Sequence, residues 1–172
     1  MQVHIHDEHK FGVVPAEEQE HKKRTTTSLV NFSLVVCRHP VHKKFLLCQE
    51  FSDQGFWLPG GAVDPGEKMS VAALREALEE SGLQVELKGL LGIEYYPCGL
   101  QPPSSLFARD VDAHLVRMRV VFYAEPSLEA LRCNTLPKCI PDFESAGACW
   151  VSREELEAGL RLRGEEVGDC LD

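Results

Sequence analysis

Apolar residues occur in short runs along the chain, separated by polar or Gly- and Pro-rich stretches. The runs rich in β-branched and aromatic residues predict strands at 27–38, 45–51, 84–96, 113–125 and 147–153. A turn-like stretch, 39–44, joins the first two, so we expect a hairpin there. Ser152 and Glu155 form a capping-box pattern that predicts a helix to about Leu160. Strands and helices are mixed without regular alternation, which predicts a layered α+β domain.

A helical pattern covers residues 70–81, with Ser70 as the expected N-cap and Gly82 as the expected left-handed residue after the last turn. At 100° per residue, one side of this helix is apolar, and we expect it to face the core. That apolar side consists of Val71, Leu74 and Leu78. The small residues that flank the opposite side, and that we expect to leave space in front of it, are Ala72 and Ala73.

The opposite side of the helix carries Glu76, Glu79 and Glu80. Like charges at this spacing repel by roughly 0.2–0.5 kcal/mol per pair, and acids in the last turns oppose the helix dipole. Oxygen-only clusters bind hard divalent cations such as Mg²⁺ or Mn²⁺, which would offset the repulsion. Taken alone, an acidic helix side is more often a solvated surface, so the surrounding residues have to decide between the two interpretations.

The acids belong to a longer pattern that begins in a Gly- and Pro-rich loop, after the stretch FWLPGG. Its fixed positions are Gly61, Glu67, Arg75, Glu76, Glu79, Glu80 and Gly82. At average residue frequencies, such a pattern arises by chance on the order of once in 10⁸ starting points. It resembles the Nudix box, here running from Gly61 to Leu83, and the chain resembles the Nudix hydrolase family. The resemblance implies an α/β/α sandwich with a mixed β-sheet, and hydrolysis of a diphosphate linked to another group X.

The resemblance also implies a role for each residue of the box. Glu79 and Glu80 would be the main ligands of Mg²⁺ or Mn²⁺, and the Gly60 carbonyl would complete the site. Glu76 would ligate a metal or act as general base. Arg75 would hold a glutamate in its productive rotamer, and Glu67 would brace the loop. Gly61 and Gly82 would be required by the backbone of the loop and of the helix exit.

Further candidates lie outside the box. Members of this family often add one acid from a downstream loop, for which we favour Glu144 as metal ligand or base over its rival Asp142. Arg117 and Arg119 alternate along one strand, so they share a face and suit substrate binding; an exposed strand face is the alternative. The weaker candidates for contacts with the substrate are Arg161, Arg163, Phe56 and Trp57, with core packing preferred for Trp57.

The length of 172 residues favours one main domain, which we place at 26–162 between an N-terminal extension, 1–25, and an acidic tail, 163–172. The four histidines of the extension suit a transition metal, but a polar extension is the simpler reading. The seven cysteines include no CxxC pair, so they predict neither a zinc ribbon nor a thioredoxin-type site. No membrane-spanning run is present, and a cytoplasmic protein is expected.

The net charge of −9 argues against a nucleic-acid polymer as partner but allows a small phosphorylated substrate if a metal supplies positive charge. A homodimer is a possible assembly of this chain. We therefore expect a metal-dependent pyrophosphohydrolase of nucleotide type. A Nudix hydrolase of a dinucleotide polyphosphate or a diphosphoinositol is the first alternative, and a non-catalytic, ligand-sensing Nudix domain is the second.

Overall fold

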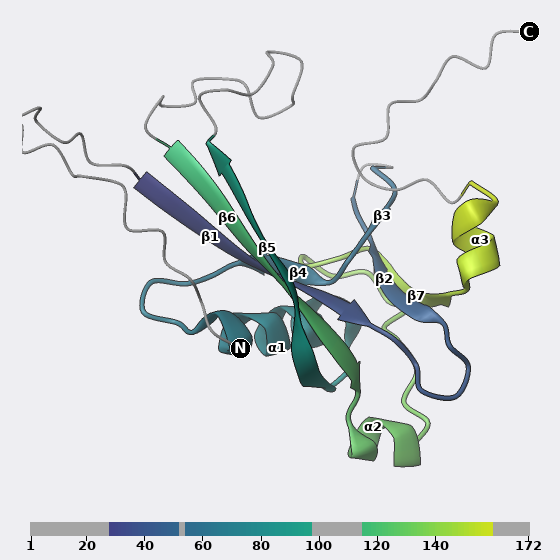
Figure 1. The fold of residues 1–172 in the computed structure, drawn as a ribbon. Helices are drawn as coiled ribbons and strands as arrows, with labels where there is room; N and C mark the ends of the chain where they lie inside the picture. Colours follow the sequence, from purple (N-terminus) through teal and green to yellow (C-terminus); the bar gives the residue numbers. More distant parts are fainter. Residues whose placement is uncertain (1–27, 52–53, 98–114, 160–172) are drawn as a thin grey trace, which may run out of the picture.

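The strands form two sheets in the computed structural model, which describes residues 28–51, 54–97 and 115–159 (Figure 1). The larger sheet has the order β4 (Gly60–Ala62), β1 (Ser28–Cys37), β6 (Leu115–Pro126) and β5 (Val85–Pro97). The smaller sheet has the order β3 (Phe56–Trp57), β2 (Phe45–Gln49) and β7 (Gly147–Val151). The helices are α1 (Met69–Ser81), α2 (Leu128–Arg132) and α3 (Arg153–Glu157).

The larger sheet is mixed, as predicted. Strand β1 runs parallel to β6 and antiparallel to β4, while β5 runs antiparallel to β6. Helix α1 contacts strands of both sheets, so it lies against their inner sides and helps to hold them together. Figure 1 shows α1 beneath β1 and α3 beside the smaller sheet. Together these elements have the α+β character that the sequence predicts.

The predicted hairpin between the first two strands is wrong. Strands β1 and β2 lie in different sheets, and within the described residues they share one isolated bridge, between Arg38 and Phe45. The physical reason is that β1 is an interior strand: β4 occupies one side and β6 the other. Because β4 occupies the middle of this side of β1, the chain turns after Cys37 and β2 pairs with β3 and β7 instead.

The core-facing side of α1 also differs from the prediction. The predicted stripe is exposed, with 49% of Val71, 40% of Leu74 and 44% of Leu78 accessible. The residues that face the interior are instead Ala72, Ala73, Glu76, Ala77 and Ser81. Small side chains let the helix axis approach the sheets closely, and Ala73 and Ala77 pack with Val35, Cys37 and Leu46. The space expected in front of Ala72 and Ala73 is therefore filled by the core.

The ends of the helices were predicted with mixed success. The left-handed conformation of Gly82 is confirmed by its φ of 70°, and its N–H donates to the Leu78 carbonyl. Ser70 is not the N-cap, because α1 begins at Met69 and the cap is Lys68, which makes no side-chain capping bond. The capping box of Ser152 and Glu155 is confirmed, although α3 ends at Glu157 rather than near residue 160. Among the described helices, none is long and apolar enough to cross a membrane.

Candidate active site

Arg75 is the centre of a cluster of carboxylates on α1 and the loop before it. Its Nε donates to Glu67 Oε1 at 3.1 Å, and a terminal nitrogen donates to Glu67 Oε2 at 2.9 Å. Its other terminal nitrogen lies 2.8 Å from Glu76 Oε1 and 3.0 Å from Glu79 Oε2. The Ala62 carbonyl accepts a further bond at 3.1 Å. One guanidinium therefore orders three acids of the box and ties α1 to β4.

Glu67 stabilises the loop that leads into the helix. Its Oε2 accepts the Asp64 N–H at 3.2 Å in addition to the bonds from Arg75. The bond from Arg75 is the main reason why the pKa of Glu67 is lowered from its usual value. This geometry agrees with the bracing role expected for Glu67 and with the orienting role expected for Arg75.

Glu76 lies at the bottom of the site and is 8% exposed. Burial raises its pKa, while the hydrogen bond and charge of Arg75 act in the opposite direction. Gly61 lies directly against the Glu76 carboxylate, because a Cβ at Gly61 would come within 2.6 Å of Oε1. A side chain at Gly61 would therefore displace the Glu76 carboxylate from its bond with Arg75.

Glu80 is bonded to the loop by Gly60, whose N–H donates to Glu80 Oε2 at 2.9 Å. Gly60 has a φ of 150°, and a Cβ there would come 2.2 Å from the Ser33 carbonyl, so no other residue fits. Burial is the main reason why the pKa of Glu80 rises to about 7, with the charges of Glu76, Glu50 and Glu144 adding to the rise. The structure thus assigns a contact to the N–H of Gly60, and the role of its carbonyl as a ligand stays a prediction.

The two rival acids of the downstream loop are in different situations. Asp142 is bound by Lys138, with Nζ at 2.8 Å from Oδ1 and 2.9 Å from Oδ2, and it accepts the N–H groups of Glu144 and Ser145. The bond with Lys138 is the main reason why its pKa is lowered. Glu144, in contrast, is close enough to Glu76 and Glu80 to raise the pKa of both.

The same loop is attached to the end of α1. Lys138 Nζ donates to the Glu79 carbonyl at 2.7 Å, and Ser145 Oγ donates to the Glu80 carbonyl at 2.6 Å. Asp142 therefore shapes the loop by holding Lys138, and Glu144 is the acid that the loop brings toward the box. This arrangement favours Glu144 over Asp142 in the predicted chemical role.

Glu50 is an acid that the sequence did not single out. It directly follows β2, and its negative charge contributes to the raised pKa of Glu80. A single glutamate after a short strand carries no distinctive spacing, so only the fold reveals its proximity to the box. Glu50, Glu76 and Glu144 all raise the pKa of Glu80 through their charges, and we call this group of four acids the acidic pocket.

The chemistry of this pocket suits a hard divalent cation. All its side-chain donors are carboxylate oxygens, and burial together with their mutual repulsion raises the pKa of Glu76 and of Glu80. Within the described ranges, no three acidic, histidine or cysteine side chains already stand in a ligand-like group. Glu79 in particular is engaged by Arg75. The donor set therefore fits Mg²⁺ or Mn²⁺. The side chains would have to come closer together to coordinate the ion.

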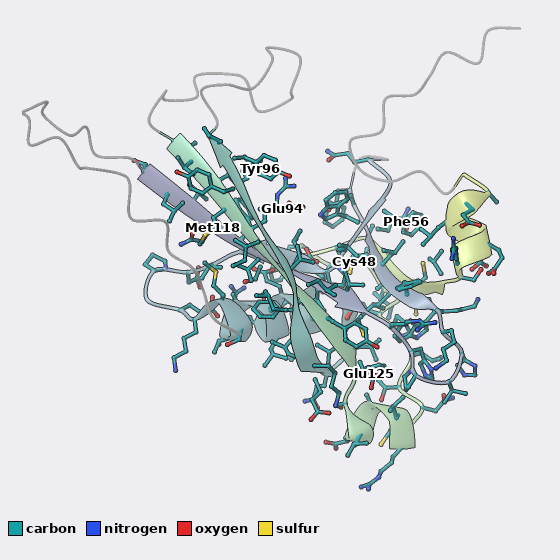
Figure 2. The ribbon with its side chains drawn as sticks, viewed as in Figure 1. Cys48, Phe56, Glu94, Tyr96, Met118 and Glu125 are labelled. Carbon is teal, nitrogen blue, oxygen red and sulfur yellow. The ribbon has the colours of Figure 1, made fainter. Side chains whose placement is uncertain are left out.

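Arg117 and Arg119 lie side by side on one face of the larger sheet, as predicted. The guanidinium of Arg117 lies over Phe32, 5.3 Å from the ring centre, and that of Arg119 lies over Tyr96 at 5.5 Å. Arg119 also lies 3.6 Å from a Glu94 carboxylate oxygen. Figure 2 shows Glu94 and Tyr96 on the side of β5 that faces β3, whereas Met118 points the other way.

Not every predicted contact residue joins this face. Phe56 lies opposite Gln49 in the smaller sheet, and Figure 2 shows it on the side toward α3, away from Glu94 and Tyr96. Trp57 lies opposite Cys48, on the other face of that short strand. The remaining candidates, Arg161 and Arg163, lie outside the described residues, as do the proposed extension and tail. Phe32 and Tyr96 were not predicted as site residues, because their proximity to the arginines depends on strand register.

The comparisons with known proteins agree with this fold. The family model described as "NUDIX domain" matches residues 28–169, which is most of the chain, so the chain belongs to the Nudix family. Several of the proteins that it resembles are named as diphosphatases or hydrolases.

Individual relatives are more distant. A Bacillus subtilis (strain 168) protein named "Putative 8-oxo-dGTP diphosphatase" is 43% identical over 53 residues, which is 30% of this chain and 36% of that protein. The match thus spans only about a third of that relative. A solved MutT protein from Methanosarcina mazei Go1 aligns with a TM-score of 0.55 and 18% identity over 81% of this chain and 88% of the other.

A pyrophosphohydrolase from Bacillus subtilis aligns with a TM-score of 0.52 and 23% identity, over 84% of this chain and 75% of the other. At such low identities, the two solved structures support the fold alone.

Proposed function

We propose that this Nudix hydrolase is a metal-dependent pyrophosphohydrolase that cleaves a nucleoside diphosphate linked to another group. Nucleoside triphosphates, oxidised nucleotides and nucleotide sugars are the substrates in view. The observation that carries the proposal is a row of cross-strand neighbours, in which Ala62 pairs with Phe32, Phe32 with Arg119, and Arg119 with Glu94. Neighbouring strands are about 4.8 Å apart, so Arg119 lies only about 10 Å from the strand that borders the acidic pocket.

The row suits a ligand with a phosphate group at one end and a flat base at the other. Phe32 and Tyr96 offer aromatic faces, and the planar guanidinium groups of Arg117 and Arg119 already lie over them. Such groups stack on bases and bind phosphate oxygens. Glu94 adds a hydrogen-bond acceptor beside Arg119. A sugar phosphate without a base would use the arginines but not the rings, so this face favours a nucleotide.

The residues of the acidic pocket divide the chemical work. A divalent cation, when bound, would neutralise charge on the diphosphate and lower the pKa of a water molecule. The residues proposed to hold it are Glu76, Glu79, Glu80 and Glu144, together with the Gly60 carbonyl. Glu144 is the preferred base for the proton of the attacking water, because Asp142 is committed to Lys138 and Glu76 to Arg75. Arg75 positions the acids and does not touch the reacting atoms.

A substrate panel tests the proposal directly. The full chain, with Mg²⁺ or Mn²⁺, is offered nucleoside triphosphates, 8-oxo-dGTP, nucleotide sugars, dinucleotide polyphosphates and diphosphoinositols, and product release is measured. We include 8-oxo-dGTP because it appears in the name of the Bacillus subtilis protein that matches part of this chain. The expected result is the highest kcat/KM on a substrate with one nucleoside diphosphate unit. Glu80→Gln, purified in parallel, controls for contaminating phosphatases.

The alternatives define the contrary results. A clear preference for a dinucleotide polyphosphate or a diphosphoinositol would overturn the substrate class while leaving the reaction type intact. Absence of turnover on every substrate, from a folded protein with metal present, would overturn the catalytic proposal itself.

A further inference from the structure

The last turn of α1 is capped by residues 138–145, which we call the capping loop and which lie far along the chain from the helix. A helix leaves its last carbonyls without partners of its own. In α1, three of them accept hydrogen bonds from this loop. The donors are Lys138 Nζ, Ser145 Oγ and the Lys138 N–H, which bond the carbonyls of Glu79, Glu80 and Ser81 at 2.7, 2.6 and 2.8 Å. The loop that carries Glu144 therefore completes the helix that carries the acids of the box.

Lys138 also supplies a charge that α1 lacks. The last turn of this helix contains Glu79 and Glu80 but no basic residue, although a cation is favourable at the negative end of a helix dipole. The ammonium of Lys138 takes this position from outside the helix. Only 15% of its side chain is exposed, and it also lies 2.8 and 2.9 Å from the two carboxylate oxygens of Asp142. One largely buried ammonium thus links the end of α1 to the capping loop.

The backbone of Lys138 is held on both sides. Its N–H bonds the end of α1, and its carbonyl accepts the Ala148 N–H of β7 at 2.7 Å. Two glycines leave room for it: a Cβ at Gly82 would lie 3.3 Å from Lys138 Cβ, and a Cβ at Gly147 would lie 3.3 Å from the Lys138 carbonyl oxygen. Lys138 therefore has little freedom to move relative to either element, and its ammonium is delivered to a fixed place.

Asp142 transmits this fixed position to Glu144. Its Oδ1 accepts the Glu144 N–H at 2.9 Å and the Ser145 N–H at 3.2 Å, and its own N–H bonds the Ser145 carbonyl at 3.1 Å. Because Lys138 bonds both Asp142 and the end of α1, a continuous series of hydrogen bonds joins α1 to the backbone of Glu144.

We propose that Lys138 is a positioning residue for hydrolysis, which holds Glu144 toward Glu80 by bonding the end of α1 and Asp142 at once. This role rests on the proposed function, in which Glu144 takes the proton of the attacking water. An ammonium has three N–H donors, and the Glu79 carbonyl and the two Asp142 oxygens accept them, so none is left for the substrate. Removal of the ammonium frees Asp142 and lets the capping loop shift, and a displacement of about 1 Å can cost about 10²-fold in rate.

Steady-state kinetics on a double-mutant cycle tests this role. Lys138→Met keeps the apolar stem and removes the ammonium, and we expect it to lower kcat by about 10–10²-fold with little change in KM. Because Lys138 acts through Glu144, the same substitution should cost nothing further in the Glu144→Gln background. Lys88→Met, which removes an exposed lysine paired with Glu86 on β5, is the matched control and should keep the wild-type kcat.

The results separate this role from the proposed function. A wild-type kcat in Lys138→Met, or losses that multiply in the double variant, would overturn the role of Lys138 while leaving the proposed function intact. A wild-type kcat in Glu144→Gln would instead remove the proposed base, and the role of Lys138 with it. Asp142→Asn weakens the same series of bonds at a more exposed side chain, so it replaces Lys138→Met in the cycle if that variant does not fold.

Hydrogen exchange of single amides, followed by NMR, gives a readout that needs no substrate. The N–H groups of Glu144 and Ser145 should exchange faster in Lys138→Met than in the wild type, whereas those of β1 should keep their protection. Unchanged exchange at Glu144 and Ser145 would mean that Lys138 does not hold the capping loop, and it would overturn the inference whatever the substrate proves to be.

Discussion

Glu79 and Glu80 are neighbours on α1, yet they belong to two electrostatically different regions. Glu79 joins Glu67 around Arg75, where each acid accepts a hydrogen bond from the guanidinium. Glu80 belongs to the acidic pocket, where its side chain is bonded to the Gly60 N–H and surrounded by further acids. In the first region the Arg75 guanidinium offsets part of the negative charge. In the second region burial raises the pKa of Glu80 and three further acids add to the rise, so we expect a cation to bind there.

This difference explains how α1 tolerates its acidic side. Ion pairs with Arg75 offset part of the repulsion, so the helix can form without metal. The remaining negative charge is concentrated where burial makes it most costly, beside Gly60 and Gly61. Arg75 positions the neighbouring acids, whereas burial raises the pKa of Glu80, so its ionised form lowers the stability of the fold.

Removal of metal should have the largest effect on activity. We expect an excess of EDTA to reduce hydrolysis of the best substrate to background, since Arg75, which bonds Glu76, does not supply the charge of a divalent ion. Release of phosphate-containing product, with and without chelator, measures this effect, and added Mg²⁺ or Mn²⁺ should restore the rate. Undiminished turnover in EDTA would remove the metal from the mechanism.

Substitution of the two loop acids, one at a time, should give the next largest effect on activity. Glu144→Gln is expected to lower kcat by roughly 10²–10⁴-fold with little change in KM, as for the loss of a general base. Asp142→Asn weakens the contact with Lys138 and loosens the loop, so a smaller loss is expected from it. Steady-state kinetics on both variants decides between them. If Asp142→Asn proves the more damaging, the assignment of the acids must be reversed; if neither matters, Glu76 becomes the leading base.

The smallest effect is a difference in stability between Glu80→Gln and Glu79→Gln without metal. A carboxyl group whose pKa is raised in the folded state loses stability as pH rises from its unfolded value toward the folded value, which is about 7 for Glu80. Glu80→Gln should therefore be more stable than the wild type above pH 7, on the order of 1–3 kcal/mol, and the gain should fade toward pH 4.5.

Glu79→Gln should show no such gain, because it weakens the ion pair with Arg75. Denaturant unfolding in EDTA at several pH values compares the two. Equal gains for both variants would mean that the two regions do not differ as described.

The sequence was sufficient where the information is local. β-Branched runs predicted β1, β5, β6 and β7, and the spacing of four residues placed Arg75 within reach of Glu79, whereas its bonds to Glu67 were not predicted. It was insufficient where neighbours are distant along the chain. The separation of β1 and β2 into two sheets depends on β4 and β6 flanking β1. The inward side of α1 was misjudged because close helix packing favoured alanines over leucines. Phe32 joins the site through strand register, and Glu50 joins it through the position of β2 in the fold.

Direct titration of the protein with Mn²⁺ tests the central claim, that the acids around Glu80 form the cation site. Isothermal titration of the wild type, Glu80→Gln and Glu67→Gln needs no substrate. We expect saturable binding by the wild type, loss of most of that affinity in Glu80→Gln, and a smaller loss in Glu67→Gln, which acts only through Arg75 and the loop. Wild-type affinity in Glu80→Gln would contradict the account, because the cation would then bind somewhere other than the acidic pocket.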